Sequence, residues 1–497
     1  MEKEKQKPLS QQTEIERWDM IEIVLEGPQD GNPYTDIILL GRFEFGHRIV
    51  EIEGFYDGEG RYCLRFMPDT IGDWRYETVS NAFELNGVSG SFTVVEPIEG
   101  NHGPVRVSNG YHFEYADGTP YYPFGTTCYA WNHQERQLEE QTLGSLKASG
   151  AFNKIRMCVF PKHYDYNLQE PPCYPFQGSP ESGWDYKAFN PEYWRHLEER
   201  IVDLQRLGIE IDLILFHPYD RWGFAKMKAE TDDFYLRYVI SRLSAFRGIW
   251  WSLANEFDLM REKSMSDWDR FFRIIQEHDR YQHLRSIHNW HHKVIHRWGD
   301  AHWYDHGKPW VTHVSIQHHE LAYISDWMER YKKPIVIDEC RYEGNIDLGW
   351  GSLSAERMVE CFWQGAAQGA YVTHGETYLN SDGIIWWSHG GILHGESPSR
   401  IRFLRSIMEE GPQLAPVKID FDWDTAAAGV DGEYYLVYFV DSRPAFRKLH
   451  LPEDAEFSIE VINTWEMTIT PLPGTYSGRC CIELPGKLYH ALRIRKV

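Results

Sequence analysis

The amino-acid sequence predicts a multidomain protein that combines α/β and all-β parts, with a central (β/α)8 TIM barrel flanked by two β-sandwich domains. Three observations predict this class. The chain has 497 residues, which is too many for one ordinary hydrophobic core. Short strands of alternating polarity occupy both ends. Between Asn101 and Pro412, buried strands alternate with amphipathic helices, as in a barrel of parallel strands.

Residues 16–97 form the first predicted domain, an immunoglobulin-like β-sandwich that follows a charged tail of residues 1–15, which we expect to be flexible. Segments such as "YTDIILLGRFEFG", "RYCLRFMPD" and "GSFTVVEP" alternate apolar and polar residues and are separated by Gly, Asp and Pro. The same pattern returns within residues 416–497, in "EYYLVYFV", "FSIEVIN" and "LYHALRIRKV". It predicts a second, smaller sandwich at the C-terminal end.

Residues 98–415 are predicted to form the barrel. The segment "PEYWRHLEERIVDLQRLGIEIDLILF" shows the repeating unit: Trp194, Ile201 and Leu204 recur at helical spacing, Gly208 ends the helix, and a buried strand follows. Continued along the chain, this pattern predicts eight strands, which are "YYPFGTTCYAW", "FNKIRMCVF", "IEIDLILFHP", "IWWSLANE", "LRSIHNWHH", "WVTHVSIQHH", "PIVIDE" and "AYVTHGETY".

Bulk composition narrows the classes of function. The formal net charge of −23 disfavours nucleic acid and anionic membranes as partners and suits a neutral substrate. No apolar run approaches the roughly 18 residues of a membrane helix, and the charged start lacks the apolar stretch of a secretory signal, so we expect a soluble, cytoplasmic protein. The eight cysteines show no C-x-x-C spacing, and we expect reduced thiols. The sequence leaves the oligomeric state open, a homo-oligomer included.

Polar residues stand at the C-terminal end of each predicted barrel strand. Because the active site of this architecture is built at that end from several strands, they are candidate site residues. They are Trp131, Arg156, His217, Asn255 with Glu256, His288 with Asn289, Gln317 with His318, Glu339, and His374 with Glu376. Trp131, Tyr342, Trp386 and Trp387 are candidate stacking platforms for sugar rings, although a tryptophan in a barrel is more often part of the core.

Two of these carboxylates are natural catalytic partners. Glu256 ends the fourth strand and Glu339 the seventh, and these positions face one another across the mouth of an eight-stranded barrel. Retaining glycoside hydrolysis needs two carboxyl groups about 5 Å apart, of which one attacks the anomeric carbon and the other protonates the leaving oxygen. We expect Arg156 to lower the pKa of Glu339, and Trp250 and Trp251 to give Glu256 a less polar setting.

The Asn–Glu pair that ends the fourth strand and the Glu that ends the seventh resemble the large clan A of retaining glycoside hydrolases. Within that clan the chain is similar to the apiosidase-like family, in "FHPYDRWGF", "WWSLANEFD", "PIVIDECRYEG" and "GAYVTHGETY" with "IIWW" of the barrel, and in "RYCLRFMPDTIGDWRYE" of the leading sandwich. The resemblance implies that Glu256 is the acid/base, that Asn255 donates a hydrogen bond to the sugar 2-hydroxyl, and that Glu339 is the nucleophile.

The resemblance also bears on substrate and cofactors. It implies a carbohydrate substrate, namely a terminal sugar of plant-derived β-glycosides or oligosaccharides, with apiose or another furanose included, and no cofactor or metal. One position departs from the pattern: many relatives have Gly before the seventh-strand Glu, whereas this chain has Asp338, which bears on the details of the subsites.

Several alternatives stay open. Glu343 lies four residues after Glu339 and could be the reactive group in a different loop geometry, while Glu376 is interpreted as a hydrogen-bond partner. Histidines are common metal ligands, but no H-E-x-x-H or comparable spacing occurs, so we expect no metal. The histidines concerned are His217, His288, His291, His292, His318, His319 and His374. The rival function classes are a carbohydrate-binding protein with a non-catalytic barrel and a metal-dependent barrel hydrolase.

Overall fold

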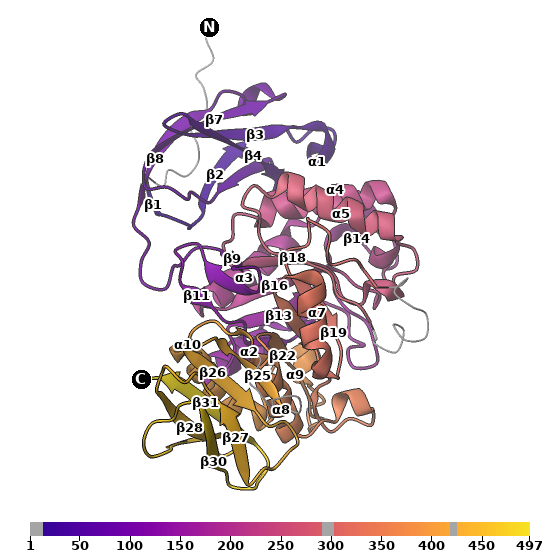
Figure 1. The fold of residues 1–497 in the computed structure, drawn as a ribbon. Coiled ribbons are helices and arrows are strands. Elements are labelled where there is room, and N and C mark those ends of the chain that lie inside the picture. The colour runs from indigo at the N-terminus through magenta and orange to yellow at the C-terminus, as the bar shows by residue number, and fades with distance from the viewer. Residues whose placement is uncertain (1–12, 291–302, 418–424) are drawn as a thin grey trace. The chain divides into compact units, whose positions relative to one another are not determined.

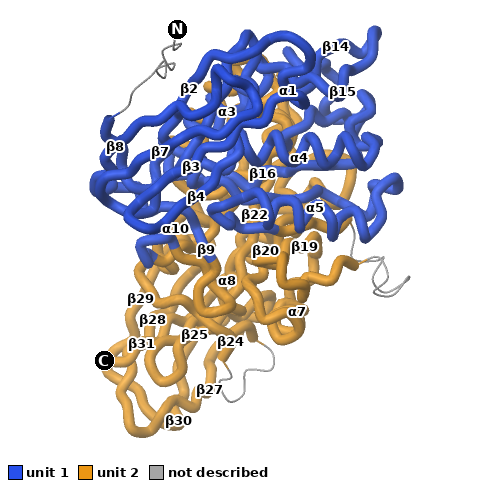
Figure 2. Tube along the Cα trace, turned by 90° about the horizontal axis from the view of Figure 1, so that it is seen from above, with its two compact units in different colours: residues 1–106, 115–119, 158–285 blue, residues 107–114, 120–157, 286–497 orange. Residues whose placement is uncertain are grey.

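The computed structural model describes residues 13–290, 303–417 and 425–497. The chain divides into two compact units, which are residues 1–106, 115–119 and 158–285 in one, and residues 107–114, 120–157 and 286–497 in the other (Figure 2). Each unit is described by itself. The predicted domains are continuous stretches of the chain with limits at residues 97 and 415. The compact units combine separate stretches, so they do not test these limits, which stay predictions.

The first unit begins with a β-sandwich whose strands pair antiparallel, except for one parallel pair at the edge of the larger sheet (Figure 1). One sheet has the order β1 (Glu14–Glu16), β8 (Ser89–Val95), β7 (Gly72–Ser80), β3 (Leu39–Phe45) and β4 (Arg48–Glu53), and the other has the order β2 (Ile21–Glu26), β6 (Arg61–Phe66) and β5 (Phe55–Tyr56). Aromatic rings fill the space between the sheets: Phe43 stacks on Phe66 with ring centroids 4.2 Å apart, and Trp74 is fully buried. The predicted N-terminal sandwich is therefore confirmed.

One segment of this sandwich differs from its predicted form. The sequence "YTDIILLGRFEFG" was expected to be extended from Tyr34, but residues Pro33–Asp36 form one turn of helix, α1, and β3 begins only at Leu39. The cause is local. Asn32 caps the turn by accepting a hydrogen bond from the backbone N–H of Tyr34, and Pro33 has the fixed φ that suits the first position of a helix.

The first unit also contains the third and fourth strands of the barrel. The predicted helix is α3 (Pro191–Arg206), and β16 (Glu210–Phe216) follows it after Gly208, whose φ of +69° ends the helix as expected. Helix α4 (Ala229–Leu243) leads into β17 (Ile249–Ala254), which pairs in parallel with β16, and α5 (Met265–His278) follows. Every residue of β16 and β17 is buried, as expected for strands covered on both faces.

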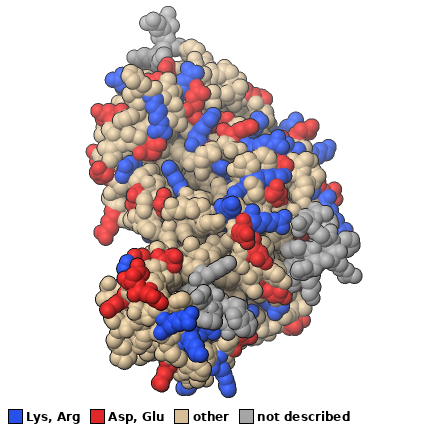
Figure 3. Space-filling view, viewed as in Figure 1, with Lys and Arg blue, Asp and Glu red and all other residues tan. Residues whose placement is uncertain are grey.

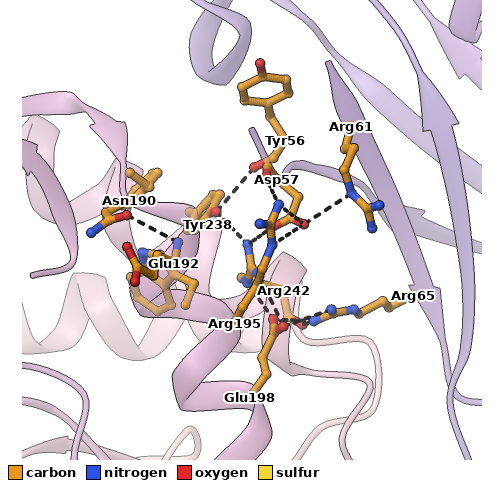
Figure 4. Close-up of polar contacts among 12 residues, drawn as sticks. Tyr56, Asp57, Arg61, Arg65, Asn190, Glu192, Arg195, Glu198, Tyr238 and Arg242 are labelled. Atoms are coloured by element: carbon orange, nitrogen blue, oxygen red, sulfur yellow. Dashed lines mark hydrogen bonds and ion pairs between the residues drawn. The ribbon is translucent and has the colours of Figure 1, made fainter. Parts of the chain in front are cut away.

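A buried ionic network connects the sandwich to α3 and α4 within this unit (Figure 4). Glu198 of α3 accepts hydrogen bonds from Arg65 of β6 at 2.5 Å and from Arg242 of α4 at 2.5 Å. Asp57, just after β5, pairs with Arg242 at 2.8 Å and with Arg195 at 3.0 Å. Burial alone would raise the pKa of Glu198, but the charges of Arg65 and Arg242 outweigh it and lower the pKa.

The second unit supplies most of the remaining barrel strands, which pair in parallel. They run in the order β13 (Lys154–Cys158), β12 (Gly125–Thr127), β22 (Tyr371–His374), β20 (Ile335–Glu339) and β19 (Val314–Gln317). Their helices are α2 (Arg136–Ser149), α7 (Ile324–Tyr331), α8 (Ala355–Ala366) and α10 (Ser397–Glu410). The fifth strand, β18, is only Arg285–Ser286, and the end of its predicted segment, from His291, lies outside the described residues. The eight strands belong to one eight-stranded sheet, so the predicted barrel is confirmed.

The C-terminal sandwich belongs to the second unit. Its main sheet has the order β24 (Ala415–Pro416), β25 (Ala426–Val430), β26 (Tyr434–Tyr438), β31 (His490–Lys496), β28 (Phe457–Asn463) and β29 (Thr468–Pro471), and β27 (Phe446–His450) pairs with β30 (Arg479–Glu483). It packs on barrel helices: the ring of Trp363 on α8 lies 6.0 Å from Tyr438, and the guanidinium of Arg400 on α10 lies 3.8 Å from the ring centroid of Trp465.

Three further properties concern the cysteines, the helices and the charged surface. All eight cysteines are free thiols in the structure. Among the described residues, none of the helices combines the length and the apolar character that crossing a membrane requires. Acidic and basic side chains are interspersed over the face seen in Figure 3.

Candidate active site

Glu339 is the last residue of β20, and three polar side chains of the second unit converge on its carboxylate. The hydroxyl of Tyr129 donates a hydrogen bond to Oε1. Arg156 Nη1 lies 3.4 Å and His288 Nε2 lies 3.3 Å from the same oxygen. Burial by itself would raise the pKa of Glu339, but His288, Arg156 and Tyr129 together hold it down to about 2. Glu339 is therefore ionised at neutral pH, as a nucleophilic carboxylate must be.

Asp338 lies beside this group and is fully buried. Its carboxylate accepts hydrogen bonds from Lys154 at 2.7 Å, Ser315 at 2.5 Å and Thr373 at 2.8 Å, and it lies 3.8 Å from Arg156 Nε. Burial opposes ionisation of Asp338, but Lys154 and Arg156 lower its pKa well below the usual range. Asp338, which stands where many relatives have Gly, thus supplies the counter-charge of the buried Lys154.

Glu256 follows β17 in the first unit. The hydroxyl of Tyr219 donates a hydrogen bond to its Oε2, and the ammonium of Lys162 lies 4.4 Å from the Tyr219 ring centroid. The backbone of Glu256 has a φ of +50°, a conformation that costs a non-glycine residue on the order of 1 kcal/mol and is concentrated at functional sites. The preceding residue, Asn255, continues the β16–β17 ladder through its backbone N–H to Phe216 at 3.0 Å.

The tryptophans that flank Glu256 in sequence have partners elsewhere. Trp250 Nε1 donates to Glu210 at 3.1 Å, and Trp251 Nε1 donates to Asp279 at 3.0 Å. Both indole N–H groups are therefore used in hydrogen bonds to buried carboxylates of the same unit, Glu210 and Asp279. His217 also has a structural contact in this unit, since its Nε2 lies 3.1 Å from the backbone oxygen of Phe160.

The predicted stacking platforms are buried, and two of them, Tyr342 and Trp387, are packed against other rings. Trp131 is fully buried, and Trp386 donates its indole N–H to Thr126 at 2.9 Å. Tyr342 lies 5.6 Å from Trp387, whose ring is also 5.7 Å from Tyr129. This cluster holds Tyr129 in place beside Glu339, and Trp387 is its most exposed ring at 7%.

Two predicted histidines occupy different surroundings in the second unit. His288 Nδ1 lies 3.1 Å from the hydroxyl of Ser315, which leaves Nε2 directed at Glu339. His318 Nδ1 accepts a hydrogen bond from the backbone N–H of Glu320 at 3.0 Å, and its ring contacts Trp327 at 5.1 Å. His288 is thus part of the Glu339 group. His291 and His292 lie outside the described residues.

Glu343, the alternative nucleophile, lies in a closed setting. It is fully buried, and its carboxylate accepts hydrogen bonds from the backbone N–H of Glu396 at 2.8 Å, the hydroxyl of Tyr378 at 3.0 Å and the hydroxyl of Ser397. It therefore caps the start of α10, whereas Glu339 keeps 6% exposure. This difference favours Glu339 as the reactive group.

Glu376 and His374 lie next to Glu343. Glu376 accepts hydrogen bonds from the backbone N–H groups of His394 at 2.5 Å and Gly395 at 2.9 Å. Burial first, and the charge of Glu343 second, raise its pKa to about 8. The sequence predicted a hydrogen-bond partner at Glu376, and the described donors to it are backbone groups of the loop before α10.

Sequence reasoning did not single out Tyr129 or Tyr219 as candidate site residues. Tyr129 lies two residues before Trp131, and Tyr219 lies two residues after His217, so each directly follows a barrel strand. The rule that collected the other candidates, which takes polar side chains from the ends of barrel strands, includes both if tyrosine is counted as polar. The signal was therefore present in "TTCYAW" and "FHPYD".

An eight-stranded parallel barrel with carboxylates at the ends of its strands fits a glycoside hydrolase, and the known relatives of the chain show that this enzyme belongs to that class. More narrowly, the chain belongs to the family described as apiosidase-like, catalytic domain, which matches residues 107–428. Two families described as domains of unknown function match the flanking segments, DUF5060 at residues 14–81 and DUF5605 at residues 423–495. The resemblance read from the sequence is confirmed.

Solved structures agree with this assignment. A candidate glycoside hydrolase from Bacteroides vulgatus is 40% identical, with a TM-score of 0.91 over 98% of this chain and 100% of that chain. A family 5 glycoside hydrolase from the same organism is 16% identical, with a TM-score of 0.63 over 80% of this chain and 94% of that chain, and shows the shared fold alone. No protein with a curated description matches the chain.

Proposed function

We propose that the protein is a retaining glycoside hydrolase in which Glu339 is the nucleophile and Glu256 the acid/base. The observation that carries the proposal is the group around Glu339. One carboxylate oxygen at the end of β20 is contacted by Tyr129, Arg156 and His288. These contacts keep the buried carboxylate charged. An attacking carboxylate must be ionised before the bond forms, and the low pKa of Glu339 meets that requirement.

The proposed reaction has two displacements. Glu339 attacks the anomeric carbon while Glu256 gives its proton to the leaving oxygen, which forms a glycosyl-enzyme ester and frees the aglycone. Glu256, now a carboxylate, takes a proton from water, and the water oxygen displaces Glu339 from the anomeric carbon. Both glutamates return to their starting states, and the configuration at the anomeric carbon is retained.

The proposed substrate is a terminal sugar of plant-derived β-glycosides or oligosaccharides, with an apiose-like furanose as the first candidate. Support comes from the apiosidase-like family to which the barrel belongs. In the family pattern, Asn255 donates a hydrogen bond to the sugar 2-hydroxyl. The acidic chain, with a net charge of −23, suits a neutral sugar better than an anionic one.

The test is a panel of aryl glycosides that differ in sugar ring and anomeric configuration, followed by proton NMR of the first product released. The expected result is hydrolysis of a β-linked terminal sugar with the product appearing first in the same configuration as the substrate. Release of the opposite anomer would overturn the retaining mechanism. Hydrolysis of pyranosides with no turnover of furanosides would overturn the proposed sugar class but leave the mechanism.

A further inference from the structure

A second cluster of ligand-type side chains lies in the second unit, apart from the group around Glu339. Glu343 belongs to β21 (Glu343–Gly344) and Glu376 to β23 (Glu376–Thr377), two short strands that pair in parallel with Glu343 opposite Glu376. His374 precedes Glu376 by two residues, so both side chains leave the chain on the same side. One ligand atom from each residue lies within 4.8 Å of the others, and all three residues are buried.

The imidazole of His374 has one nitrogen without a hydrogen bond. Among the described residues no donor or acceptor pairs with its Nε2, although the residue is fully buried, and the nearest charged atom is Glu376 Oε2 at 3.9 Å. The other nitrogen, Nδ1, lies 3.0 Å from the hydroxyl of Thr126. A buried polar atom without a partner is costly and calls for a ligand.

The surroundings of His374 match those of a metal-binding histidine. The indole N–H of Trp386 can only donate, so it donates to Thr126 Oγ1 at 2.9 Å, and the second lone pair of that oxygen can accept Nδ1–H of His374. In this tautomer the lone pair of Nε2 faces the carboxylates. Metal-ligating histidines commonly have their second ring nitrogen fixed in this way by a neighbouring polar group.

The carboxylates are held in place, and the residue packed beside them must be a glycine. Each oxygen of Glu376 accepts one backbone N–H among the described residues, so each retains a free lone pair. A Cβ at residue 395 would come within 2.6 Å of both Glu343 Oε2 and Glu376 Oε2, and Gly395 has none. Among the described ion pairs, neither carboxylate has a lysine or arginine partner, so two adjacent buried acids lack a counter-charge from the protein.

We propose that Glu343, His374 and Glu376 bind a divalent metal ion of the zinc and manganese class. Two carboxylate oxygens and one imidazole nitrogen form a donor set that suits these ions, whereas magnesium and calcium prefer oxygen alone. The ion neutralises the paired acids and ties the ends of β22, β21 and β23 to the loop that starts α10. Its role is structural, because the proposed chemistry at Glu339 and Glu256 uses no metal step.

The competing occupant of this cluster is a proton shared by the two carboxyl groups, with the glutamates serving only to anchor the loop before α10. The two cases respond oppositely to Glu376→Gln. An amide imitates the protonated acid and keeps the volume, so a proton-sharing pair tolerates it with little loss of stability. A metal site loses a ligand, and its affinity falls by at least about tenfold.

The experiment measures metal in the full-length protein, grown with zinc and manganese in the medium and purified with its affinity tag removed and without chelator. Elemental mass spectrometry should find close to one equivalent of zinc or manganese in the wild type and at least tenfold less in E376Q. The matched control is E339Q, which removes a carboxylate from the neighbouring group and should keep the full metal content. Thermal unfolding after incubation with EDTA should occur at lower temperature in the wild type and in E339Q but not in E376Q.

Three results would overturn the proposal. The first is less than a tenth of an equivalent of any divalent metal in the wild type together with an unfolding temperature that EDTA does not change. The second is a metal content that E376Q leaves unaltered, which would place the ion elsewhere. The third is an E376Q protein that unfolds at the same temperature as the wild type without chelator, because loss of a ligand to a structural ion should lower that temperature; this result identifies the shared proton. If E376Q does not fold, the wild-type metal content and EDTA response decide alone.

Discussion

At the scale of single residues, Glu339 is defined by what surrounds it. A lone buried carboxylate would take up a proton, because desolvation raises its pKa. Here His288, Arg156 and Tyr129 reverse that effect. The carboxylate of Asp338 supplies a counter-charge to Lys154 and Arg156. The same carboxylate thus combines burial, which excludes water from the reacting bond, with full charge.

The hydroxyl of Tyr129 gives the sharpest single-residue test of this environment. Tyr129→Phe keeps the ring that packs on Trp387 and removes the hydroxyl, which donates to Glu339 and accepts from Arg156 Nη1 at 3.3 Å. A hydrogen bond to a charged group contributes about 1.5–3 kcal/mol, so kcat should fall roughly 10- to 100-fold. Because the lost donor had lowered the pKa of Glu339, the acid limb of the kcat/KM profile should move to higher pH.

The matched control for that variant is Tyr122→Phe, which removes a hydroxyl that donates to the backbone oxygen of Gly411 at 3.1 Å. A pH profile that stays in place in Tyr129→Phe, or that moves equally in both variants, would mean that the Tyr129 hydroxyl does not act through Glu339.

Glu256 can be tested by its substrate dependence. If it is the acid/base, Glu256→Ala should slow glycosides with poor leaving groups far more than activated aryl glycosides, since only the former need the proton. Added azide should partly restore turnover by attacking the glycosyl-enzyme. Steady-state rates on matched aryl and alkyl glycosides measure the difference, and equal losses on both would count against the role.

At the scale of elements, the sequence predicted the buried strands of the barrel but not every local turn. The barrel strands appear where "IEIDLILF", "IWWSLA" and "PIVIDE" predicted them, because strands covered on both faces are apolar throughout. The turn α1 was missed because its signal is one capping Asn and one Pro inside an apolar context. The fifth strand was predicted longer than β18, since the sequence gives no sign of where backbone pairing stops.

The contacts that complete the site could not be read in the same way. Tyr129 and Glu339 are 210 positions apart, and His374 meets Glu343 across two strands rather than through a fixed spacing. A strand count places residues at the same end of a barrel, but it does not say which side chains touch. The metal-capable group was therefore invisible to a search for local ligand motifs.

The ionic network of Glu198 links three elements, and its loss should be costly. Glu198→Gln leaves Arg65 and Arg242 buried with a weaker counter-charge, so the free energy of unfolding should fall by roughly 3–5 kcal/mol. Urea denaturation followed by tryptophan fluorescence measures it. Glu51→Gln is the control, because its pair with Arg42 is half exposed and should contribute less than about 1 kcal/mol. Similar effects of both substitutions would show that the buried network does not hold the sandwich to α3 and α4.

At the scale of the whole molecule, we expect the C-terminal sandwich to stabilise the barrel without taking part in catalysis. It contributes no candidate catalytic residue, but it covers Trp363 on α8 and Arg400 on α10. Deleting residues 417–497 should therefore lower the unfolding temperature or solubility without moving the pH optimum of hydrolysis. A truncated protein that stays folded and shows a new pH profile would mean that this domain shapes the active site.

The central claim, that Glu339 is the nucleophile of a retaining hydrolase, is tested most directly by covalent labelling. The sugar identified by the glycoside panel, prepared as a 2-fluoro derivative with a good leaving group, should trap the glycosyl-enzyme, because the fluorine slows its hydrolysis more than its formation. Mass spectrometry of the digested protein should then find one labelled peptide, with the sugar on Glu339 between Asp338 and Cys340. Label on Glu343 or Glu376, or an active enzyme that takes up no label, would contradict the claim.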